Sequence, residues 1–471
     1  MKCTCFQERE CLHKMDSVTM ARALFGSSMA FHIIFATLGV GIPAMIVIAE
    51  VLYHWKKDRD YALLARRWTQ GFAIILGVAI PSGTIVGVMI SLLWPGYMEI
   101  VQQVIALPFQ VEIFAFFLES LFMAIYVYAA DRLTPLLRIV SVTLVAFGAG
   151  ASAVLITDAH AWMNTPRGFR IDEAGNVVDV DIWAAIFNPA IFITAQHVLA
   201  SAYMTGAFAI VSVAAYKLLR GRASTEREQA YHRKALMMGL LFGGVMSLTT
   251  AFNGHGTAQY LHEYLPEKLA AAEGLFETTD RAPLAIGGYV DPATEKVVGG
   301  LEIPWTLSFL AGNSFDTVVR GLHDFPRENW PPLYIHTLFN LMVFIGTLLI
   351  ALSLGALAWK YVLKKPFPKW LLAVLVAAFP LSMLGIETGW VFSCSGRQPW
   401  VIYGVMRTEE AALQSESLGF LLFLFLGIYV LLLVATILVM RMFFRRRPVG
   451  RELEAYAGNY PDGAAAEGGV R

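Results

Sequence analysis

Long apolar runs separated by short polar segments make up most of the chain. A run of about 20 apolar residues is long enough to cross the roughly 30 Å hydrocarbon core of a membrane as one helix. Such runs lie at residues 24–52, 68–93, 108–129, 136–157, 184–216, 234–253, 333–358, 370–393 and 417–441. The pattern therefore predicts an all-α integral membrane protein with about nine transmembrane helices.

The polar segments divide the chain further. We predict a polar N-terminal leader, transmembrane helices one to six, a long outer connection, transmembrane helices seven to nine and a C-terminal tail. Their boundaries are, in that order, residues 1–23, 24–253, 254–332, 333–441 and 442–471. The leader lacks the apolar stretch of a cleavable signal peptide. Its cysteines, Cys3, Cys5 and Cys11, are expected to belong to a dispensable tail.

The outer connection over residues 254–332 is much longer than the others. Connections of this length are usually functional or disordered. A helix-like stretch at residues 266–273 and later anchors such as Trp305 and Pro331 favour a small ordered cap on the outer face. A solvated linker is the alternative.

Lysine and arginine residues predict the orientation, because they concentrate in cytoplasmic loops. One alternating set of loops is rich in them and the opposite set is sparse. The rich set includes residues 56–67, 132–138, 217–234, 360–369 and 441–451. The N-terminus is therefore predicted outside and the C-terminus in the cytoplasm, an arrangement that nine helices satisfy.

Composition excludes several classes of protein. The chain is 57% hydrophobic and only 15% charged, whereas soluble domains are about 25% charged. A soluble multidomain enzyme and a disordered chain do not fit these values. A formal net charge of zero argues against a nucleic-acid partner. The four cysteines form no CxxC pair, so a zinc or iron–sulfur site is not expected.

Ionisable side chains inside membrane helices are costly and mark functional sites by default. Those that lie away from the ends of the apolar runs are His32, Glu112, Glu119, His197 and Glu387. At a rise of about 1.5 Å per residue, they gather in the outer half of the predicted bilayer. Glu112 and Glu119 are seven residues apart and share one helix face, which suggests a proton path or a site beside a metal. A buried, protonated, hydrogen-bonded pair is the alternative.

Two histidines in different helices suit haem iron better than zinc. Zinc takes three or four clustered ligands, whereas haem takes one or two axial ligands, and a His/Met pair is an established combination. His32, His197 and Met342 are the candidates. A satisfied core histidine is the alternative for each imidazole, and Met342 alone would be read as core packing.

The motif Gly396-Arg397-Gln398-Pro399-Trp400 resembles subunit I of the cytochrome bd-type quinol oxidases. The resemblance extends over nearly the whole chain, and its motifs are specific in combination. The other matching segments are residues 31–35 (FHIIF), 112–120 (EIFAFFLES), 188–190 (NPA) with His197, 203–206 (YMTG) and 267–273 (EKLAAAE).

The resemblance implies three haems in this subunit. His197 and Met342 would be axial ligands of a low-spin haem b. His32 would hold one of two active-site haems, which are a high-spin haem b and either haem d or a further haem b. Glu112 and Glu119 would lie beside this pair as catalytic groups, on the proton or oxygen side.

The resemblance also implies a quinol site in the outer connection. Lys268 and Glu273 would engage quinol, with a surface salt-bridged helix as the alternative. Trp390 would lie between haems, and Arg397 near a haem propionate. Ubiquinol and menaquinol both remain open as the substrate.

Two positions depart from the family pattern. Cys394 stands where the family usually has a glutamate that ligates the high-spin haem b. A thiolate can ligate haem iron, but Glu387, water or absence of that haem are the alternatives. Asn340 stands where many relatives have arginine, which removes a positive charge near the low-spin haem.

The implied function is oxidation of membrane quinol and reduction of O2 to water, generating a proton-motive force without pumping. The implied partners are subunit II, membrane lipids and, as a further option, a small single-helix accessory subunit. The expected location is a bacterial or archaeal cytoplasmic (inner) membrane. The alternatives are a noncatalytic bd-like paralogue, acting as a haem-binding scaffold or as a carrier for another electron donor, and a proton-coupled transporter.

Overall fold

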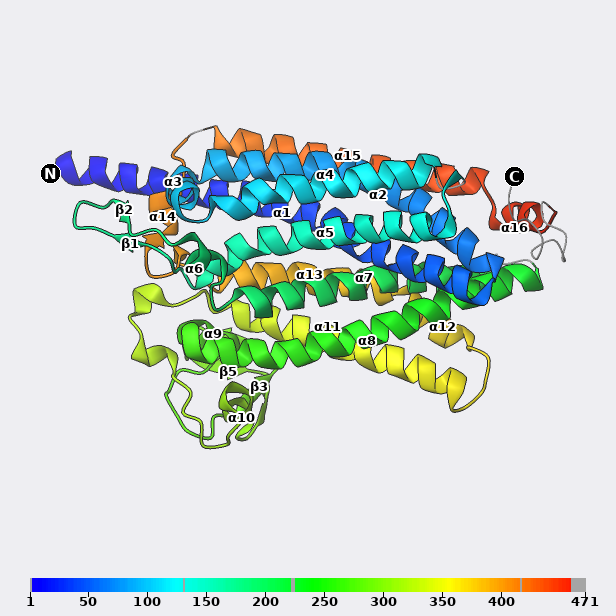
Figure 1. The fold of residues 1–471 in the computed structure, drawn as a ribbon. Helices are drawn as coiled ribbons and strands as arrows, with labels where there is room; N and C mark the ends of the chain where they lie inside the picture. Colours follow the sequence, from blue (N-terminus) through cyan, green and yellow to red (C-terminus); the bar gives the residue numbers. More distant parts are fainter. Residues whose placement is uncertain (1, 130–131, 222–224, 416, 459–471) are drawn as a thin grey trace.

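Long helices running side by side form the body of the protein in a computed structural model that describes residues 2–129, 132–221, 225–415 and 417–458 (Figure 1). Within these ranges, nine helical segments are long and apolar enough to cross a membrane. They are α1 (Lys2–Lys56), α2 (Arg59–Leu93), α4 (Ala106–Ala129), α5 (Pro135–Asn164), α7 (Ile191–Leu219), α8 (Glu226–Tyr264), α11 (Ile335–Tyr361), α12 (Lys369–Val376) together with α13 (Ala378–Ser395), and α15 (Leu418–Arg446). The prediction of an all-α membrane protein with about nine spans is confirmed.

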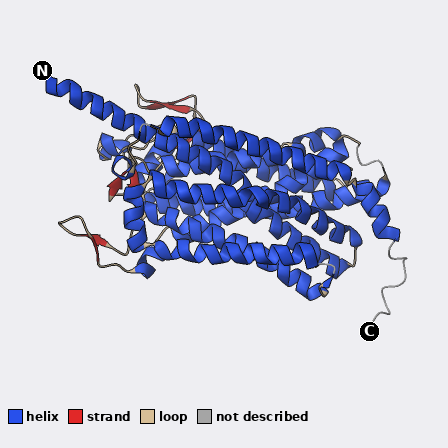
Figure 2. Ribbon diagram, turned by 90° about the horizontal axis from the view of Figure 1, so that it is seen from above, coloured by secondary structure: helices blue, strands red, loops and turns tan. Residues whose placement is uncertain are grey.

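The shorter elements gather at one end of the bundle, which we call the loop end (Figures 1 and 2). The helices there are α3 (Pro95–Val104), α6 (Ile182–Ile186), α9 (Pro266–Glu273), α10 (Thr306–Gly312), α14 (Thr408–Ala411) and the 3-10 turns η2 (Leu322–Asp324) and η3 (Arg327–Asn329). The strands are β1 (Arg170–Ile171), β2 (Val177–Val178), β3 (Leu284–Ile286), β4 (Tyr289–Asp291), β5 (Lys296–Val298), β6 (Leu301–Ile303), β7 (Trp400–Ile402) and β8 (Met406–Arg407). They form the antiparallel pairs β1–β2, β3–β6, β4–β5 and β7–β8. The last helix, α16 (Val449–Gly458), lies at the opposite end.

The expected outer connection is an ordered cap, as its helix-like stretch predicted. Residues 266–273 form α9, and β3 to β6 with α10 follow before α11 begins. The cap starts later than residue 254, however, because α8 continues as a helix to Tyr264. His255 and His262, which fall within the expected connection, therefore lie on the last turns of α8.

Three other boundaries differ from the expected ones. The fifth run, 184–216, is interrupted: Asp181 caps the separate helix α6, and α7 starts at Ile191, after Asn188-Pro189. A proline has no N–H to continue a helical ladder. α5 continues to Asn164, so His160 lies on a helix rather than in a loop. α1 begins at Lys2, within the expected leader.

Parts of the expected leader and tail lie outside the residues and side chains that the structure describes. The side chains of residues 2–16, including Cys3, Cys5 and Cys11, are not among the described ones. The tail is described to residue 458, and its remainder lies outside the described residues. The expectations for these parts stay predictions.

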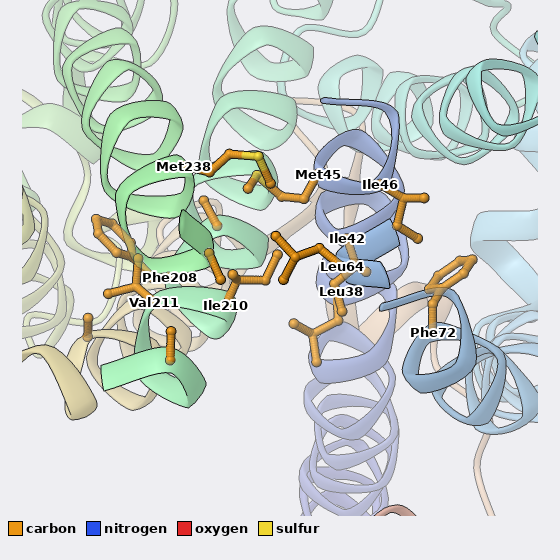
Figure 3. Close-up of a cluster of buried hydrophobic side chains, with 14 of the residues drawn as sticks. Leu38, Ile42, Met45, Ile46, Leu64, Phe72, Phe208, Ile210, Val211 and Met238 are labelled. Carbon is orange, nitrogen blue, oxygen red and sulfur yellow. The ribbon is translucent and has the colours of Figure 1, made fainter. Parts of the chain in front are cut away.

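The core is centred on α1 and α7, which are buried over most of their apolar stretches. Figure 3 shows side chains from α1, α2, α7 and α8 meeting there. The labelled residues are Leu38, Ile42, Met45, Ile46, Leu64, Phe72, Phe208, Ile210, Val211 and Met238. α15 by contrast is exposed along nearly all of its apolar length, as expected for a helix that faces lipid or another subunit.

Close contact between α1 and α7 depends on two glycines. A Cβ atom on Gly206 would lie 2.5 Å from the carbonyl carbon of Gly41, and one on Gly41 would lie 2.3 Å from the carbonyl oxygen of Ala202. These neighbours are backbone atoms that cannot rotate away. Small residues let membrane helices approach this closely, because packing rather than water exclusion drives their association.

We expect Gly206→Val to separate α1 from α7 and to destabilise the bundle by at least about 1–3 kcal/mol, the usual cost of overpacking. The measurement is the midpoint of thermal unfolding of the detergent-solubilised protein. Gly427→Ala on α15 is the matched control, since a Cβ there meets nothing within 4 Å. Equal midpoints of thermal unfolding for the two variants would show that the contact between Gly41 and Gly206 does not stabilise the bundle.

Candidate functional site

His32 is held in one ring orientation by α2. Its Nδ1 lies 3.0 Å from the Ser82 hydroxyl oxygen, and that hydroxyl donates to the Ala79 carbonyl at 3.0 Å. Since the hydroxyl proton is engaged with Ala79, Nδ1 is the donor to Ser82 and Nε2 keeps its lone pair. Gly83 leaves space beside the ring, because a Cβ there would lie 3.0 Å from His32 Cε1. The half-buried imidazole can therefore offer Nε2 to a metal.

His197 lies on α7 with its Nδ1 2.8 Å from Oδ1 of Asn253 on α8. Met342 lies on α11, and its sulfur faces Gly389 of α13, where a Cβ would approach to 2.9 Å. α7 and α11 both pack against α8 and against α13. The two candidate ligands thus belong to helices that share the same two neighbours, at the loop end of the bundle.

Single ligands of this kind fit haem iron, which needs one or two axial side chains. His32, His197 and Met342 are each only half-buried, and Gly83 and Gly389 provide space beside two of them. In the described part of the chain, no three His, Cys, Asp or Glu residues cluster as ligands of a bare metal ion.

One face of α4 carries polar side chains at intervals of seven residues. Glu112 accepts a hydrogen bond from Ser152 on α5 at 2.6 Å, and Glu119 is buried. Tyr126, the next position on this face, donates to the carboxylate of Glu50 on α1. Residues seven apart lie on one side of a helix, so the predicted pairing of Glu112 and Glu119 extends to a third polar group. We call Glu112 and Glu119 the acid line.

Glu50 anchors the end of this face that lies away from the loop end. The carboxylate is fully buried and pairs with Arg138 on α5 at 2.8 Å. Nε2 of His54 lies 3.8 Å from its other oxygen. Sequence reasoning missed Glu50, which falls inside the first apolar run but only two residues from its end.

The short helix α9 buries both residues expected to bind quinol. Lys268 and Glu273 are each only 5% exposed, so an exposed salt-bridged helix does not match the structure. Nζ of Lys268 donates to the Ser393 carbonyl on α13 at 3.0 Å. Glu273 Oε2 is buried with no hydrogen-bond partner among the described residues.

Burial changes the protonation of both groups. It lowers the pKa of the Lys268 amine to about 7, and the Arg397 guanidinium acts in the same direction. Burial raises the pKa of the Glu273 carboxyl to about 8. Burial disfavours the charged form of either group. Near neutral pH, α9 therefore holds a mostly protonated acid and an amine that readily gives up its proton, which suits proton exchange with a ligand.

The end of α13 joins α9, α5 and α11. Lys268 bonds the backbone of Ser393, and Nε2 of His160 on α5 lies 2.9 Å from the Ser393 hydroxyl. Tyr334, just before α11, donates to the Ser395 hydroxyl at 3.0 Å. Cys394, between these serines, is exposed. Sequence reasoning missed His160, and only its position three residues beyond the fourth apolar run could have indicated a helical site.

The remaining expected haem neighbours lie on or just after α13. The Trp390 ring packs against His160 with centroids 5.4 Å apart. Glu387 is half-buried and its Oε1 has no partner in the described part of the chain. Arg397 is buried, and its Nη1 is likewise unpartnered among the described residues. A buried, unpaired guanidinium nitrogen is suited to an anionic group such as a haem propionate.

Asn340 has a structural use that the sequence did not indicate. Its Oδ1 accepts from the Gly287 N–H at 2.7 Å, and its Nδ2 donates to the His336 carbonyl at 3.1 Å. Nδ1 of buried His336 lies 2.8 Å from the Ala272 carbonyl on α9. These bonds fasten α11, which carries Met342, to the cap.

Comparison with known proteins gives consistent matches over almost the whole chain. A family model for cytochrome bd terminal oxidase subunit I matches residues 20–448. A Bacillus subtilis (strain 168) protein named putative cytochrome bd menaquinol oxidase subunit I is 57% identical over 440 residues, which cover 93% of this chain and 99% of that protein. A second protein of that strain, named cytochrome bd ubiquinol oxidase subunit 1, is 30% identical, with 93% and 95% covered. The bd oxidase structure from Geobacillus thermodenitrificans matches with a TM-score of 0.87 and 42% identity, covering 92% of this chain and 99% of that one.

Proposed function

The chain belongs to the cytochrome bd terminal oxidase subunit I family, and we propose that it oxidises a membrane quinol and passes the electrons to O2, which is reduced to water. One observation supports this most directly. The short helix α9 buries both Lys268 and Glu273, and Lys268 bonds Ser393 of α13, at the same end of the bundle as His197 and Met342. A proton-exchanging pair and single iron ligands at one end are what quinol oxidation requires.

The chain's residues supply haem ligands in this proposal. His197 and Met342 would hold the low-spin haem b, and His32 one of the two active-site haems. When bound, the haems supply the redox chemistry between quinol and O2. The protein holds and orients them, and Arg397 provides a buried positive charge for a propionate. The oxygen site would use either haem d or a further haem b.

Quinol oxidation releases two electrons and two protons. In the proposed site, the Glu273 carboxylate accepts a proton from a quinol hydroxyl, and Lys268 orients the same ring by hydrogen bonding. The relatives carry the names menaquinol oxidase and ubiquinol oxidase, and both quinols present the hydroxyl that this chemistry uses. The released protons leave on the side of the loop end, which the orientation predicts to be outside.

Protons for water formation would come from the opposite side. The Glu50 cluster stands at that end of α4, and the acid line leads from it toward the loop end. Charge moved across the membrane in this way stores about 2.3 kcal/mol per charge per 100 mV, so a proton-motive force arises without pumping. Glu112 and Glu119 are the proposed proton carriers next to the oxygen site.

The proposed partners and location follow from the family to which the chain belongs. Subunit II is the expected partner, a small single-helix subunit is a further candidate, and the location is the cytoplasmic (inner) membrane of a bacterium or archaeon. The exposed apolar face of α15 suits lipid or such a partner. A noncatalytic scaffold is not favoured, because a scaffold needs neither the buried α9 pair nor iron ligands.

The role of Cys394 is proposed separately, as a ligand of the second active-site haem. It is exposed on α13, and Lys268 and Arg397 lie close enough for their positive charges to interact with its sulfur. A thiolate ligand donates electron density to iron. Glu387, water or absence of this haem remain the alternatives.

We expect His197→Ala to abolish the reducible low-spin haem signal and quinol-driven O2 uptake, because one axial ligand is removed. The measurements are reduced-minus-oxidised spectra and oxygen-electrode traces of the purified complex. His323→Ala, at an exposed histidine of the cap, should keep the signal. Normal quinol-driven O2 uptake in His197→Ala would refute the ligand assignment and with it the proposed electron route.

We expect wild-type quinol turnover to rise with pH until about 8, because only deprotonated Glu273 accepts a proton and its pKa is about 8. Glu273→Gln should lose this rise and lower turnover by about 10²–10⁴-fold, the usual contribution of a general base, with haem content intact. The control Glu302→Gln changes an exposed acid of the same cap. Haem loss or unchanged kinetics in Glu273→Gln would count against this role.

We expect Cys394→Ala to shift or remove one high-spin haem spectrum, while the low-spin signal assigned to His197 and Met342 remains. Optical and electron paramagnetic resonance spectra of the oxidised and reduced complex provide the measurement. An unchanged high-spin spectrum would end the Cys394 assignment and direct attention to Glu387.

A further inference from the structure

Asn253 is a polar side chain in the apolar interior, and all of its hydrogen-bonding groups are used. It lies near the loop end of α8 and is only 4% exposed. Its Nδ2 donates to the Ile193 carbonyl at 3.1 Å and to Oε1 of Gln196 at 3.1 Å. Its Oδ1 lies 2.8 Å from Nδ1 of His197. All three partners are on α7.

These contacts determine which way the amide points. The Ile193 carbonyl can only accept a hydrogen bond, so the amide nitrogen must face it. A reversed amide would set Oδ1 against that carbonyl oxygen and leave two buried acceptors facing each other, which is costly in an apolar interior. Oδ1 therefore faces His197.

The orientation of Asn253 in turn determines the tautomer of His197. An amide oxygen cannot donate, so the bond at 2.8 Å requires the proton on Nδ1. Nε2 is then left with its lone pair, which is the form of imidazole that coordinates iron. The same bond stops the ring from rotating. The corresponding contact at His32 uses the Ser82 hydroxyl, whose single proton can be redirected, so it constrains that ring less strongly.

We propose that Asn253 is a positioning residue for the low-spin haem: it holds His197 with Nε2 directed to iron and adjusts the basicity of that ligand through Nδ1. The proposal rests on the proposed role of His197. Groups that accept a hydrogen bond from a ligating histidine fix its tautomer and raise its basicity, and their loss typically costs 10–100-fold in metal affinity or activity. Asn253 itself does not touch substrate or haem iron in this proposal.

The basicity effect has a sign that can be tested. A more basic imidazole stabilises ferric over ferrous iron and lowers the midpoint potential. Asn253→Asp retains an acceptor of similar shape and strengthens it, so the potential of the low-spin haem should fall. Asn253→Leu has similar volume but no acceptor, so the potential should rise. For each variant we expect about a tenfold change in the affinity of His197 for ferric relative to ferrous iron. Such a change corresponds to a shift of about 59 mV in the midpoint potential of a one-electron couple.

The experiment is a redox titration of the low-spin haem in the purified complex, followed optically, together with the ferric low-spin resonance signal. A negative charge alone would also lower the potential, so Gln196→Glu is the control for Asn253→Asp. It places a carboxylate beside Asn253 but leaves the bond from His197 to Asn253 in place. Ser247→Ala removes a buried hydroxyl that donates to the Gly243 carbonyl of the same helix, and it is the control for the loss of a polar group.

The proposal is supported if the midpoint potential falls in Asn253→Asp and rises in Asn253→Leu. The fall in Asn253→Asp must also be larger than the fall in Gln196→Glu. If Asn253→Leu does not retain haem, the comparison of Asn253→Asp with Gln196→Glu is used alone. A larger fall in midpoint potential in Asn253→Asp then supports the proposal. Equal shifts in Asn253→Asp and Gln196→Glu, or shifts of the same sign in Asp and Leu, would overturn it. Failure of the proposed function is distinguishable, because His197→Ala would then keep its low-spin signal.

Discussion

The interior of a membrane bundle contains no water to satisfy polar groups, so each buried polar side chain needs a partner within the protein. In this structure several of these partners lie on a neighbouring helix. Asn253 of α8 bonds His197 of α7, Ser152 of α5 bonds Glu112 of α4, and Glu50 of α1 pairs with Arg138 of α5. The groups proposed for chemistry therefore also determine how the helices are oriented.

The same constraint joins the cap to the bundle. Lys268 of α9 has its bond to the Ser393 carbonyl on α13, while Asn340 and His336 fasten α11 to the turn at Gly287 and to the end of α9. The proposed quinol residues and the proposed ligand Met342 are thus parts of one connected unit. The cap is therefore joined to α11 and α13 by defined hydrogen bonds.

Glycines provide the space in which large side chains can lie. Gly41 and Gly206 bring α1 and α7 into backbone contact, and Gly83 and Gly389 leave space beside His32 and Met342. At Gly83 and Gly389 the missing side chain leaves a proposed haem ligand uncrowded, whereas at Gly41 and Gly206 it lets two helix backbones meet. The close approach is favourable because dispersion contacts, rather than water exclusion, hold membrane helices together.

The sequence alone determined the number and approximate position of the membrane helices, because the thickness of the bilayer requires about 20 apolar residues for each span. It also determined the family, through specific motifs such as Gly396–Trp400, and the ordered helix at residues 266–273. It did not reveal that α8 and α5 continue past their apolar runs, because polar helix ends that leave the hydrocarbon have the composition of loops. The partners of His197, Glu50 and Lys268 were decided only by the tertiary structure, since each lies on a helix distant in the chain and hydropathy carries no information about which helix faces which.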